Sequence, residues 1–226
     1  MDNGTRDELL GRLVGTIESV TTPHPVRVAV DGPPAAGKTT LADELALVLR
    51  NKGREVGRAS IEGFLVSRVH RYRRGVDSPE GCYRDSFDFG ALHRVLLDPL
   101  GPDGDRRFRQ AVYDRDTDTA LSPPVTTAAA DAVLLFDGVF LLRPELIDKW
   151  DLRIFVSTAF EETLARARIR DLAALGSAGR VEQRFRNRYL PSQQLYFDTV
   201  RPTDLADIVV HNDEIERPAW VLRSDR

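Results

Sequence analysis

The chain of 226 residues is long enough for one α/β domain with its own core and too short for two domains of ordinary size. Hydrophobic residues make up 42% of it and charged residues 30%, which excludes a largely disordered chain. The formal net charge of −3 provides no overall positive field for nucleic acid or anionic membranes. Any anion site must therefore be local.

The cysteine content and the apolar runs point to a cytoplasmic protein. The single cysteine, Cys82, excludes an internal disulfide and a multi-cysteine metal site, as expected in a reducing compartment. The four histidines show no metal-ligand spacing, so we expect no zinc. The N-terminus has neither a basic start nor an apolar run, and the longest apolar stretch, residues 132–142, is too short for a bilayer span.

The first elements predict a strand–helix–strand unit preceded by a helix. Residues 5–20 carry apolar side chains at helical spacing and predict an amphipathic helix. Residues 26–30 are typical of a short buried strand, residues 39–52 of a helix ended by Gly53, and residues 55–61 of a second strand. Such units build parallel sheets.

The middle of the chain is less regular. Residues 62–90 lose periodicity and gather arginine, glycine and aspartate, and we assign this irregular length to substrate handling. A helix is expected at residues 87–97, followed by a strand at 106–113 that pairs with part of residues 118–125.

Core strands return in the second half. They are expected at residues 132–136 and 152–156, with a turn and short helix at 143–149 between them, and the last strand at 206–210. Thr158 and Glu161 have capping-box spacing before a helix that reaches about residue 175.

A phosphate-binding motif lies between the first strand and its helix. Glycines at both ends let successive backbone N–H groups turn inward around phosphate oxygens, and the helix N-terminus adds partial positive charge. Lys38 would reach the β- and γ-phosphates of ATP, and the Thr39 hydroxyl would ligate Mg²⁺. The residues expected to bind the nucleotide are Gly32, Pro33, Pro34, Ala35, Ala36, Gly37, Lys38, Thr39 and Thr40.

A second metal ligand is expected from the apolar strand at residues 132–136. Asp137 follows this strand directly, as in a Walker B segment, at the sheet edge where the phosphate loop also opens. The alternative is an aspartate in an ordinary turn. We expect Thr39 and Asp137 to hold the metal.

With Lys38, Asp137 and the segment Ser60-Ile61-Glu62-Gly63-Phe64, the chain resembles the uridine kinase, pantothenate kinase and phosphoribulokinase group of P-loop kinases over residues 26–212. The arginine-rich helix before Asp171 and a late Arg-Pro-Thr segment at residues 201–203 extend the likeness. The expected fold is a three-layer α/β P-loop NTPase fold with a mostly parallel central sheet, a small substrate-side hairpin and a helical lid. We expect one kinase domain over residues 1–226, with an N-terminal helix (1–22), a substrate-binding insertion (62–125) and a lid region (166–192).

The resemblance implies a catalytic base after the second strand. Family members place an aspartate there to orient or deprotonate the attacking hydroxyl, and Glu62 occupies that position here. A glutamate keeps the charge and adds a methylene, so the acceptor must sit differently. The alternatives are a surface glutamate or a metal-shell ligand, and Asp31 is the reserve candidate for the base.

The resemblance also implies lid arginines that neutralise the transferring phosphate. The matching residues are Arg166, Arg170 and Arg180, of which we favour Arg170 as catalytic. Arg166 and Arg170 lie four apart and could face the same anion. Glu162 lies four before Arg166, so part of this row could instead be a solvated salt-bridge face.

The acceptor pocket departs from the family pattern. The sugar-binding aspartate of uridine kinases falls on Cys82, and Tyr113 matches the aromatic that packs on the base. The histidine that reads uracil becomes Asp118, which alters the hydrogen bonds offered to a base. Hydroxyl recognition then falls to three nearby residues, the last of which could equally cap its helix: Tyr83, Asp85 and Asp88.

These observations predict an ATP- and Mg²⁺-dependent small-molecule kinase, with a nucleoside as the first acceptor and a pantothenate-like or sugar alcohol next. Nucleic-acid and membrane partners are not expected, and homo-oligomerisation is left open. One rival is a nucleotide-dependent switch, although no Asn-Lys-x-Asp motif is present. The other is a nucleic-acid-linked ATPase that uses the basic run at residues 68–74, which could also be a solvated loop.

Overall fold

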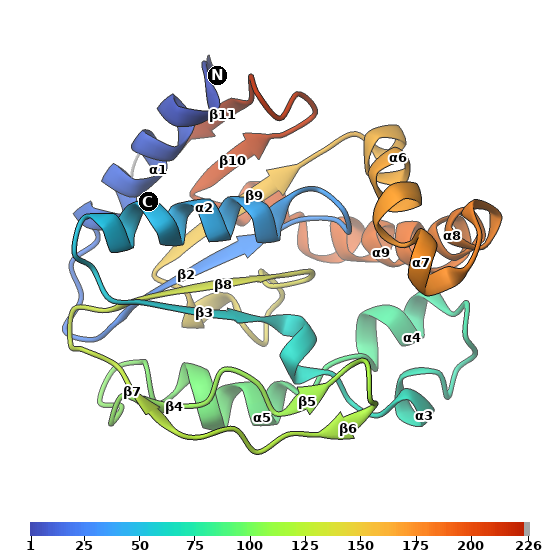
Figure 1. Cartoon of the computed structure of the whole chain (residues 1–226), viewed down its shortest axis with the longest axis horizontal. Coiled ribbons are helices and arrows are strands. Elements are labelled where there is room, and N and C mark those ends of the chain that lie inside the picture. The colour runs from blue at the N-terminus through green and yellow to red at the C-terminus, as the bar shows by residue number, and fades with distance from the viewer. Residues whose placement is uncertain (224–226) are drawn as a thin grey trace.

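The computed structural model describes residues 1–223, in which a seven-stranded sheet has the order β1-β11-β10-β9-β2-β8-β3 (Figure 1). Five adjacent strands run parallel, and β11 and β1 extend the sheet antiparallel at one edge. The strands are β1 (Asp2–Asn3), β2 (Val26–Asp31), β3 (Val56–Ser60), β8 (Val133–Gly138), β9 (Leu152–Ser157), β10 (Ile208–His211) and β11 (Ala219–Leu222).

Helices cover both faces of this sheet (Figure 1). Because side chains alternate along a strand, Val28 and Val30 pack with α1 (Arg6–Ser19) and α2 (Lys38–Asn51), whereas Ala29 packs on the opposite face. That opposite face is covered by α4 (Pro79–Arg84), α5 (Phe89–Leu92) with the π-helical turn η2 (His93–Leu97), and α9 (Leu190–Val200). The predicted three-layer α/β fold is confirmed.

The same alternation sends two strand-end carboxylates to different faces. Asp31, at the end of β2, lies on the same face of the sheet as Ala29 and faces α9. Asp137 of β8 lies on the same face as Val133 and Leu135 and faces α2. The two acids therefore have different neighbours, although both lie at the carboxyl ends of parallel strands.

The insertion after β3 is more ordered than expected. Its first part, expected to be irregular, contains three short helices: η1 (Ile61–Phe64), α3 (Arg68–Arg71) and α4. The predicted hairpin is present as β5 (Tyr113–Asp114) paired with β6 (Thr119–Ala120). A separate ladder joins β4 (Arg107–Phe108) to β7 (Thr126–Thr127), so the pairing extends beyond residue 125.

The helices after β9 project beyond the end of the sheet, opposite α3 and α4 (Figure 1). They are α6 (Phe160–Arg170), α7 (Leu172–Leu175), α8 (Ala178–Arg184) and the π-helical turn η4 (Phe185–Tyr189), which leads into α9. The predicted capping box is wrong: Ala159 is the N-cap, and the Thr158 hydroxyl donates to the Ala36 carbonyl 3.4 Å away. Thr158 thus contacts the phosphate loop and leaves the helix N-terminus without a side-chain cap.

The last part of the chain contains η3 (Ile147–Lys149) between β8 and β9, and α10 (Pro202–Leu205) before β10. The strand β11 was not predicted. It is stabilised by antiparallel pairing with β10. No helix within residues 1–223 is both long and apolar enough to cross a bilayer.

Candidate active site

The phosphate loop has a backbone that only glycine permits at its two ends. Gly32 has φ 149° and Gly37 has φ 94°. A Cβ on Gly32 would lie 2.3 Å from the Val156 carbonyl oxygen, and one on Gly37 would lie 2.6 Å from Nδ2 of Asn212. Asn212 donates to the Ala36 carbonyl at 2.8 Å and so holds the loop from β10.

Lys38 is folded over its own loop. Its Nζ donates to the Pro33 carbonyl at 2.7 Å, and the residue is 8% exposed. Burial lowers the pKa of Lys38 to about 8, while the charges of Asp31 and Asp137 act in the opposite direction. Within residues 1–223 the ammonium forms no ion pair, so it is available for an anion.

Thr39 and Asp137 meet as expected for a shared metal site. The Thr39 hydroxyl donates to Oδ2 of Asp137 at 2.6 Å. The other carboxylate oxygen accepts from Arg58 at 2.9 Å, and Arg58 also pairs with Asp43 of α2. Arg58 therefore fixes the orientation of a carboxylate that is 3% exposed.

Asp31 lies beneath the phosphate loop and does not line the cavity next to it. The carboxylate is fully buried, accepts from the Gly32 N–H at 2.7 Å and accepts from the Tyr196 hydroxyl at 2.6 Å. Burial raises the pKa of Asp31, and burial together with the Asp31 charge raises that of Tyr196 well above its usual value. Asp31 has no route to an acceptor hydroxyl, and its bonds stabilise the start of the loop.

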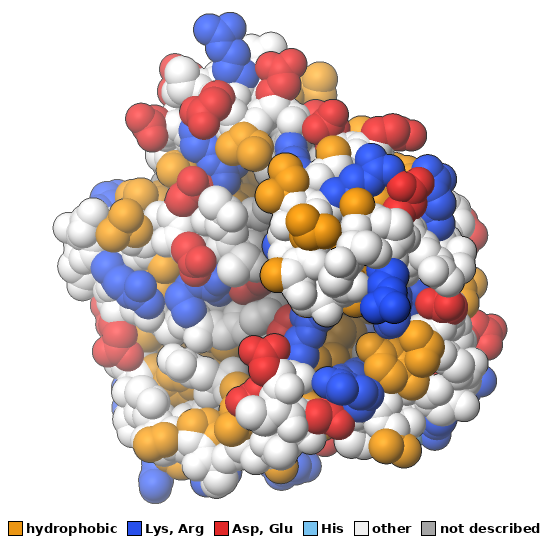
Figure 2. Space-filling view, turned by 45° about the vertical axis from the view of Figure 1, so that its right-hand side comes forward, with side chains coloured by type: hydrophobic (Ala, Val, Ile, Leu, Met, Phe, Trp, Pro, Cys, Tyr) orange, Lys and Arg blue, Asp and Glu red, His pale blue; other side chains and the backbone are white. Residues whose placement is uncertain are grey.

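A cavity of about 350 Å³ adjoins the loop, and Figure 2 shows a hollow with acidic and basic side chains around its opening. Lys38, Thr39, Asp137 and Glu62 all line it. Oε2 of Glu62 accepts from Arg115 at 2.9 Å, and both side chains are about half exposed, at 49% and 59%. The carboxylate after β3 therefore faces the cavity that contains the phosphate-binding lysine.

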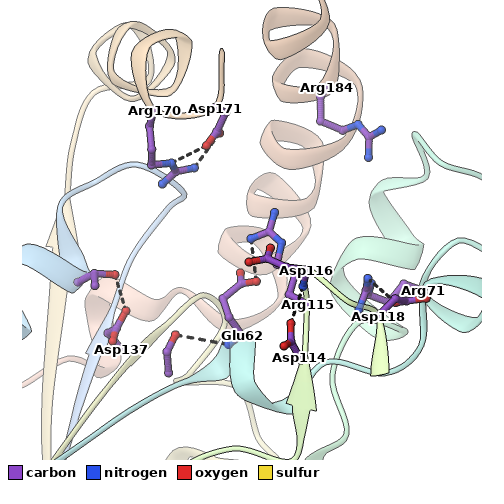
Figure 3. Close-up of polar contacts among 12 residues, drawn as sticks. Glu62, Arg71, Asp114, Arg115, Asp116, Asp118, Asp137, Arg170, Asp171 and Arg184 are labelled. Carbon is purple, nitrogen blue, oxygen red and sulfur yellow. Dashed lines mark hydrogen bonds and ion pairs between the residues drawn. The ribbon is translucent and has the colours of Figure 1, made fainter. Parts of the chain in front are cut away.

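A second ion pair, Arg170 with Asp171, faces Glu62 across this cavity (Figure 3). Arg170, at the end of α6, donates to both carboxylate oxygens of Asp171 at 2.7 and 2.9 Å. The other lid candidates do not join it. Arg166 donates to the carbonyls of Asn212 and Asp213 at 2.8 Å, and neither Arg166 nor the exposed Arg180 lines the cavity.

The rest of the predicted nucleotide-binding set divides along the loop. Pro34 and Ala35 line the cavity, whereas Pro33 contributes its carbonyl to Lys38. Ala36 is buried with its carbonyl bonded to Asn212, and Thr40 is exposed in the first turn of α2 outside the cavity.

The five predicted substrate-binding residues lie around the pocket but do not line it. Asp85 is bonded to Arg73 and Arg74 at 2.7 and 2.5 Å, which lowers its pKa. Asp88 caps α5 by accepting from the Ala91 N–H at 2.8 Å. Tyr83 is 6% exposed and packs edge-on against Phe140 in the core.

Tyr113 and Asp118 form one network outside the pocket wall. The Tyr113 hydroxyl donates to Asp118 at 2.7 Å, and Asp118 also accepts from Arg71 at 3.2 Å. Arg71 itself lines the cavity, so these two residues orient a pocket side chain. The hydrogen bond from Tyr113 is the main reason that the pKa of Asp118 is lowered.

Several lining residues were not predicted. Arg71 and Tyr72 belong to the basic run at residues 68–74, whose aromatic residue was the available signal. Arg115 gave no signal, because it is a charged residue in an apparently exposed segment. Asp171 ends the arginine-rich segment that carries the family likeness, but no role was assigned to it. Four more come from η4 and α9, where a change of helical period hid their common face: Arg188, Tyr189, Ser192 and Gln193.

The strand order, the glycine-bounded phosphate loop and its strand-end aspartate define a P-loop kinase fold. No family model matches the chain. It is 29% identical over 154 residues to uridine-cytidine kinase B of Dictyostelium discoideum, covering 68% of this chain and 61% of that relative. It is 24% identical over 189 residues to a uridine kinase of Chlamydia pneumoniae, covering 82% of this chain and 81% of the relative.

A solved structure described as a possible uridine kinase from Bacillus stearothermophilus matches with a TM-score of 0.71 and 24% identity, covering 90% of this chain and 97% of the other. The chain is thus similar in sequence to uridine kinases and has the fold of P-loop kinases. It spans about three fifths of the length of the Dictyostelium relative.

Proposed function

We propose that the protein transfers the γ-phosphate of ATP to a hydroxyl of a small molecule. The observation that carries this proposal is one cavity into which the phosphate-loop lysine, the Thr39–Asp137 pair and the Glu62 carboxylate all open. A phosphoryl transfer site needs these parts within reach of one another, because catalysis there is mainly positioning and electrostatic stabilisation.

The residues present fit a magnesium ion. Mg²⁺ is usually held by one or two protein oxygens together with phosphates and water, and the 2.6 Å contact between Thr39 and Asp137 offers two such oxygens. No group of three or more His, Cys, Asp or Glu within residues 1–223 could hold a metal by itself, which agrees with a cation shared with a nucleotide. When bound, Mg²⁺ neutralises charge on the transferring phosphate.

Glu62 is the better candidate for the base. Its carboxylate is half exposed and lines the cavity, whereas Asp31 is fully buried with two hydrogen bonds already in place. In this role Glu62 exchanges its Arg115 partner for the acceptor hydroxyl and accepts the proton as the oxygen attacks phosphorus. The added methylene sets the acceptor further from β3 than an aspartate would.

Two cations complete the proposed transfer site. Lys38 leaves the Pro33 carbonyl to donate to the β- and γ-phosphate oxygens. Arg170 exchanges Asp171 for the γ-phosphate and stabilises charge in the transition state. Arg166, bonded to the backbone at the end of β10, and the exposed Arg180 would then contribute to nucleotide binding only after the lid helices move.

A nucleoside is the acceptor class that the names of the relatives support. The pocket supports a second candidate, another small alcohol, because the expected sugar- and base-reading positions are occupied otherwise. Cys82 lines the cavity where uridine kinases have an aspartate, and Asp118 is bonded to Tyr113 and Arg71.

The test is acceptor-dependent release of ADP from Mg·ATP, with nucleosides, hydroxy acids and sugars as acceptors and Lys38→Ala as the control. We expect at least one acceptor to stimulate ADP release and to appear as a phosphate ester by mass spectrometry. Turnover that no acceptor stimulates would favour a nucleotide switch or ATPase, and stimulation by RNA alone would favour the nucleic-acid-linked rival.

A further inference from the structure

The acceptor side of the cavity contains a buried arginine without an acidic partner. Arg188 lines the cavity, is 3% exposed, and donates from Nη1 to the carbonyls of Val76 and Ser78 at 3.2 and 3.0 Å. It forms no ion pair within residues 1–223. A guanidinium has five N–H donors and a full charge, and neutral carbonyls leave that charge uncompensated.

A second polar group that lines this cavity has no hydrogen-bond partner among the described residues. Gln193 lines this cavity and also an adjoining one beside Pro33, and it is 5% exposed. Within residues 1–223 neither its amide oxygen nor its amide nitrogen forms a hydrogen bond. Leaving buried polar groups unpaired is destabilising, so a buried, unsatisfied amide in a cavity wall indicates a ligand.

The helix geometry explains why these two residues share a wall. Arg188 and Gln193 are five positions apart and would lie on different faces of a regular α-helix. The π-helical turn η4 ends two residues before Pro191, whose ring cannot fit a regular helix interior. The wider turn lets both residues line the cavity.

Nearby groups do not supply the missing negative charge. Cys82 interacts with Arg188, but burial raises the pKa of its thiol and keeps it neutral. The Tyr72 ring lies 4.9 Å from the Arg188 guanidinium and 5.7 Å from that of Arg184. Arg184 is itself matched by Asp77 at 3.7 Å.

The geometry points to an anionic acceptor: we infer that Arg188 and Gln193 bind a carboxylate or phosphate monoester on the molecule whose hydroxyl is phosphorylated. A carboxylate or phosphate would accept from the free N–H groups of Arg188, and the Gln193 amide would complete the contact. Phosphate and carboxylate share this chemistry. The inference rests on the proposed kinase function and names its substrate class, a hydroxy acid or a phosphorylated alcohol, in place of a neutral nucleoside.

The first test uses the wild-type protein and matched acceptors that differ in charge. ADP release would be measured with three pairs of acceptors, each an anion and its neutral analogue: D-glycerate and glyceramide, pantothenate and its primary amide, and ribose 5-phosphate and ribose. Uridine would be tested as a neutral nucleoside. We expect one charged member to exceed its neutral partner by roughly 10- to 100-fold in kcat/KM, the range for a charge-assisted hydrogen bond. Success of the carboxylate or the phosphate arm identifies the source of the charge.

The second test uses variants of the arginine and of the thiol beside it. Arg188→Gln should remove the preference for the charged member, whereas Arg186→Gln, an exposed arginine of the same turn paired with Glu182, should retain it. Cys82→Asp would place a carboxylate beside Arg188 and should lower use of the charged acceptor by a similar factor. Cys82→Ser is its neutral control, and this second pair keeps the test decisive if Arg188→Gln does not fold.

The failures are distinguishable. Equal use of charged and neutral partners, efficient use of uridine alone, or an unchanged preference in both Arg188→Gln and Cys82→Asp would overturn the anionic acceptor while leaving the kinase intact. An absence of transfer to every acceptor would overturn the kinase proposal, and the inference with it.

Discussion

On the nucleotide side of the cavity, consecutive residues from the end of β2 to the first turn of α2 provide a backbone cradle, an ammonium and a hydroxyl. On the acceptor side, lining residues come from two distant parts of the chain, η1, α3 and α4 in the first half and η4 and α9 near the end. The first side is specified by backbone conformation, which a short motif can encode. The acceptor side depends on which side chains from distant parts of the chain meet. On this side the five predicted substrate-binding residues do not line the cavity.

The largest expected effect breaks the nucleotide side. Lys38→Ala should lower phosphate transfer by at least about 10³-fold, because the variant loses the ammonium that contacts the β- and γ-phosphates. Circular dichroism should show an intact fold, since Lys38 forms no ion pair within residues 1–223. Transfer at the wild-type rate would remove the phosphate loop from the mechanism.

The next effect separates chemistry from nucleotide binding. Glu62→Gln should lower kcat by roughly 10²- to 10³-fold, because the amide cannot accept the hydroxyl proton, while the Kd of ATP stays within about threefold. Single-turnover kinetics and ATP titration would measure the two quantities. Glu80→Gln, an exposed acid outside the cavity, is the matched control. An unchanged rate would exclude Glu62 as the base.

A third change tests the link between α9 and the phosphate loop. Tyr196→Phe should lower the free energy of unfolding by about 1–3 kcal/mol, because Asp31 loses a donor and the Leu142 N–H loses its acceptor. The raised pKa of Asp31 means that its ionised form costs stability, so the loss should diminish as the pH falls below that pKa. Urea unfolding at several pH values would measure it, and a loss independent of pH would contradict the role of the Asp31 charge.

The smallest expected effect is a pH dependence on the nucleotide side. Lys38 has a pKa of about 8 in the nucleotide-free protein, so binding a phosphate anion above that pH must take up a proton. The Kd of ATP should therefore rise by up to about tenfold per pH unit above pH 8. Calorimetry in buffers of different ionisation enthalpy would detect the proton, and Lys38→Ala should not show this dependence.

The sequence was most informative where local pattern and chemistry coincide. Short apolar runs located all five parallel strands to within two residues at each end. The contact between Thr39 and Asp137 followed from the rule that parallel strands share a carboxyl edge. Site roles for Lys38, Glu62 and Arg170 remain predictions, although the three residues line one cavity.

The acceptor wall could not be predicted for physical reasons. Asp85 and Asp88 look like hydroxyl ligands in the sequence, but two arginines and a helix N-terminus use their oxygens. Arg188 and Gln193 look unrelated at a period of 3.6, because the π-helical turn before Pro191 changes the period locally. Tertiary partners thus removed two predicted ligands from the site, and an irregular helix concealed two lining residues.

The hydrogen bond from Tyr196 to Asp31 has a mechanical consequence. Its 2.6 Å length ties α9 to the carboxylate that also holds the first amide of the phosphate loop. A movement of α9 along its axis would therefore displace Asp31, which holds the first amide of the phosphate loop. The same helix carries Gln193 and follows the turn that contains Arg188. An acceptor molecule that shifts α9 on binding would thus also move the phosphate loop, through the hydrogen bond from Tyr196 to Asp31.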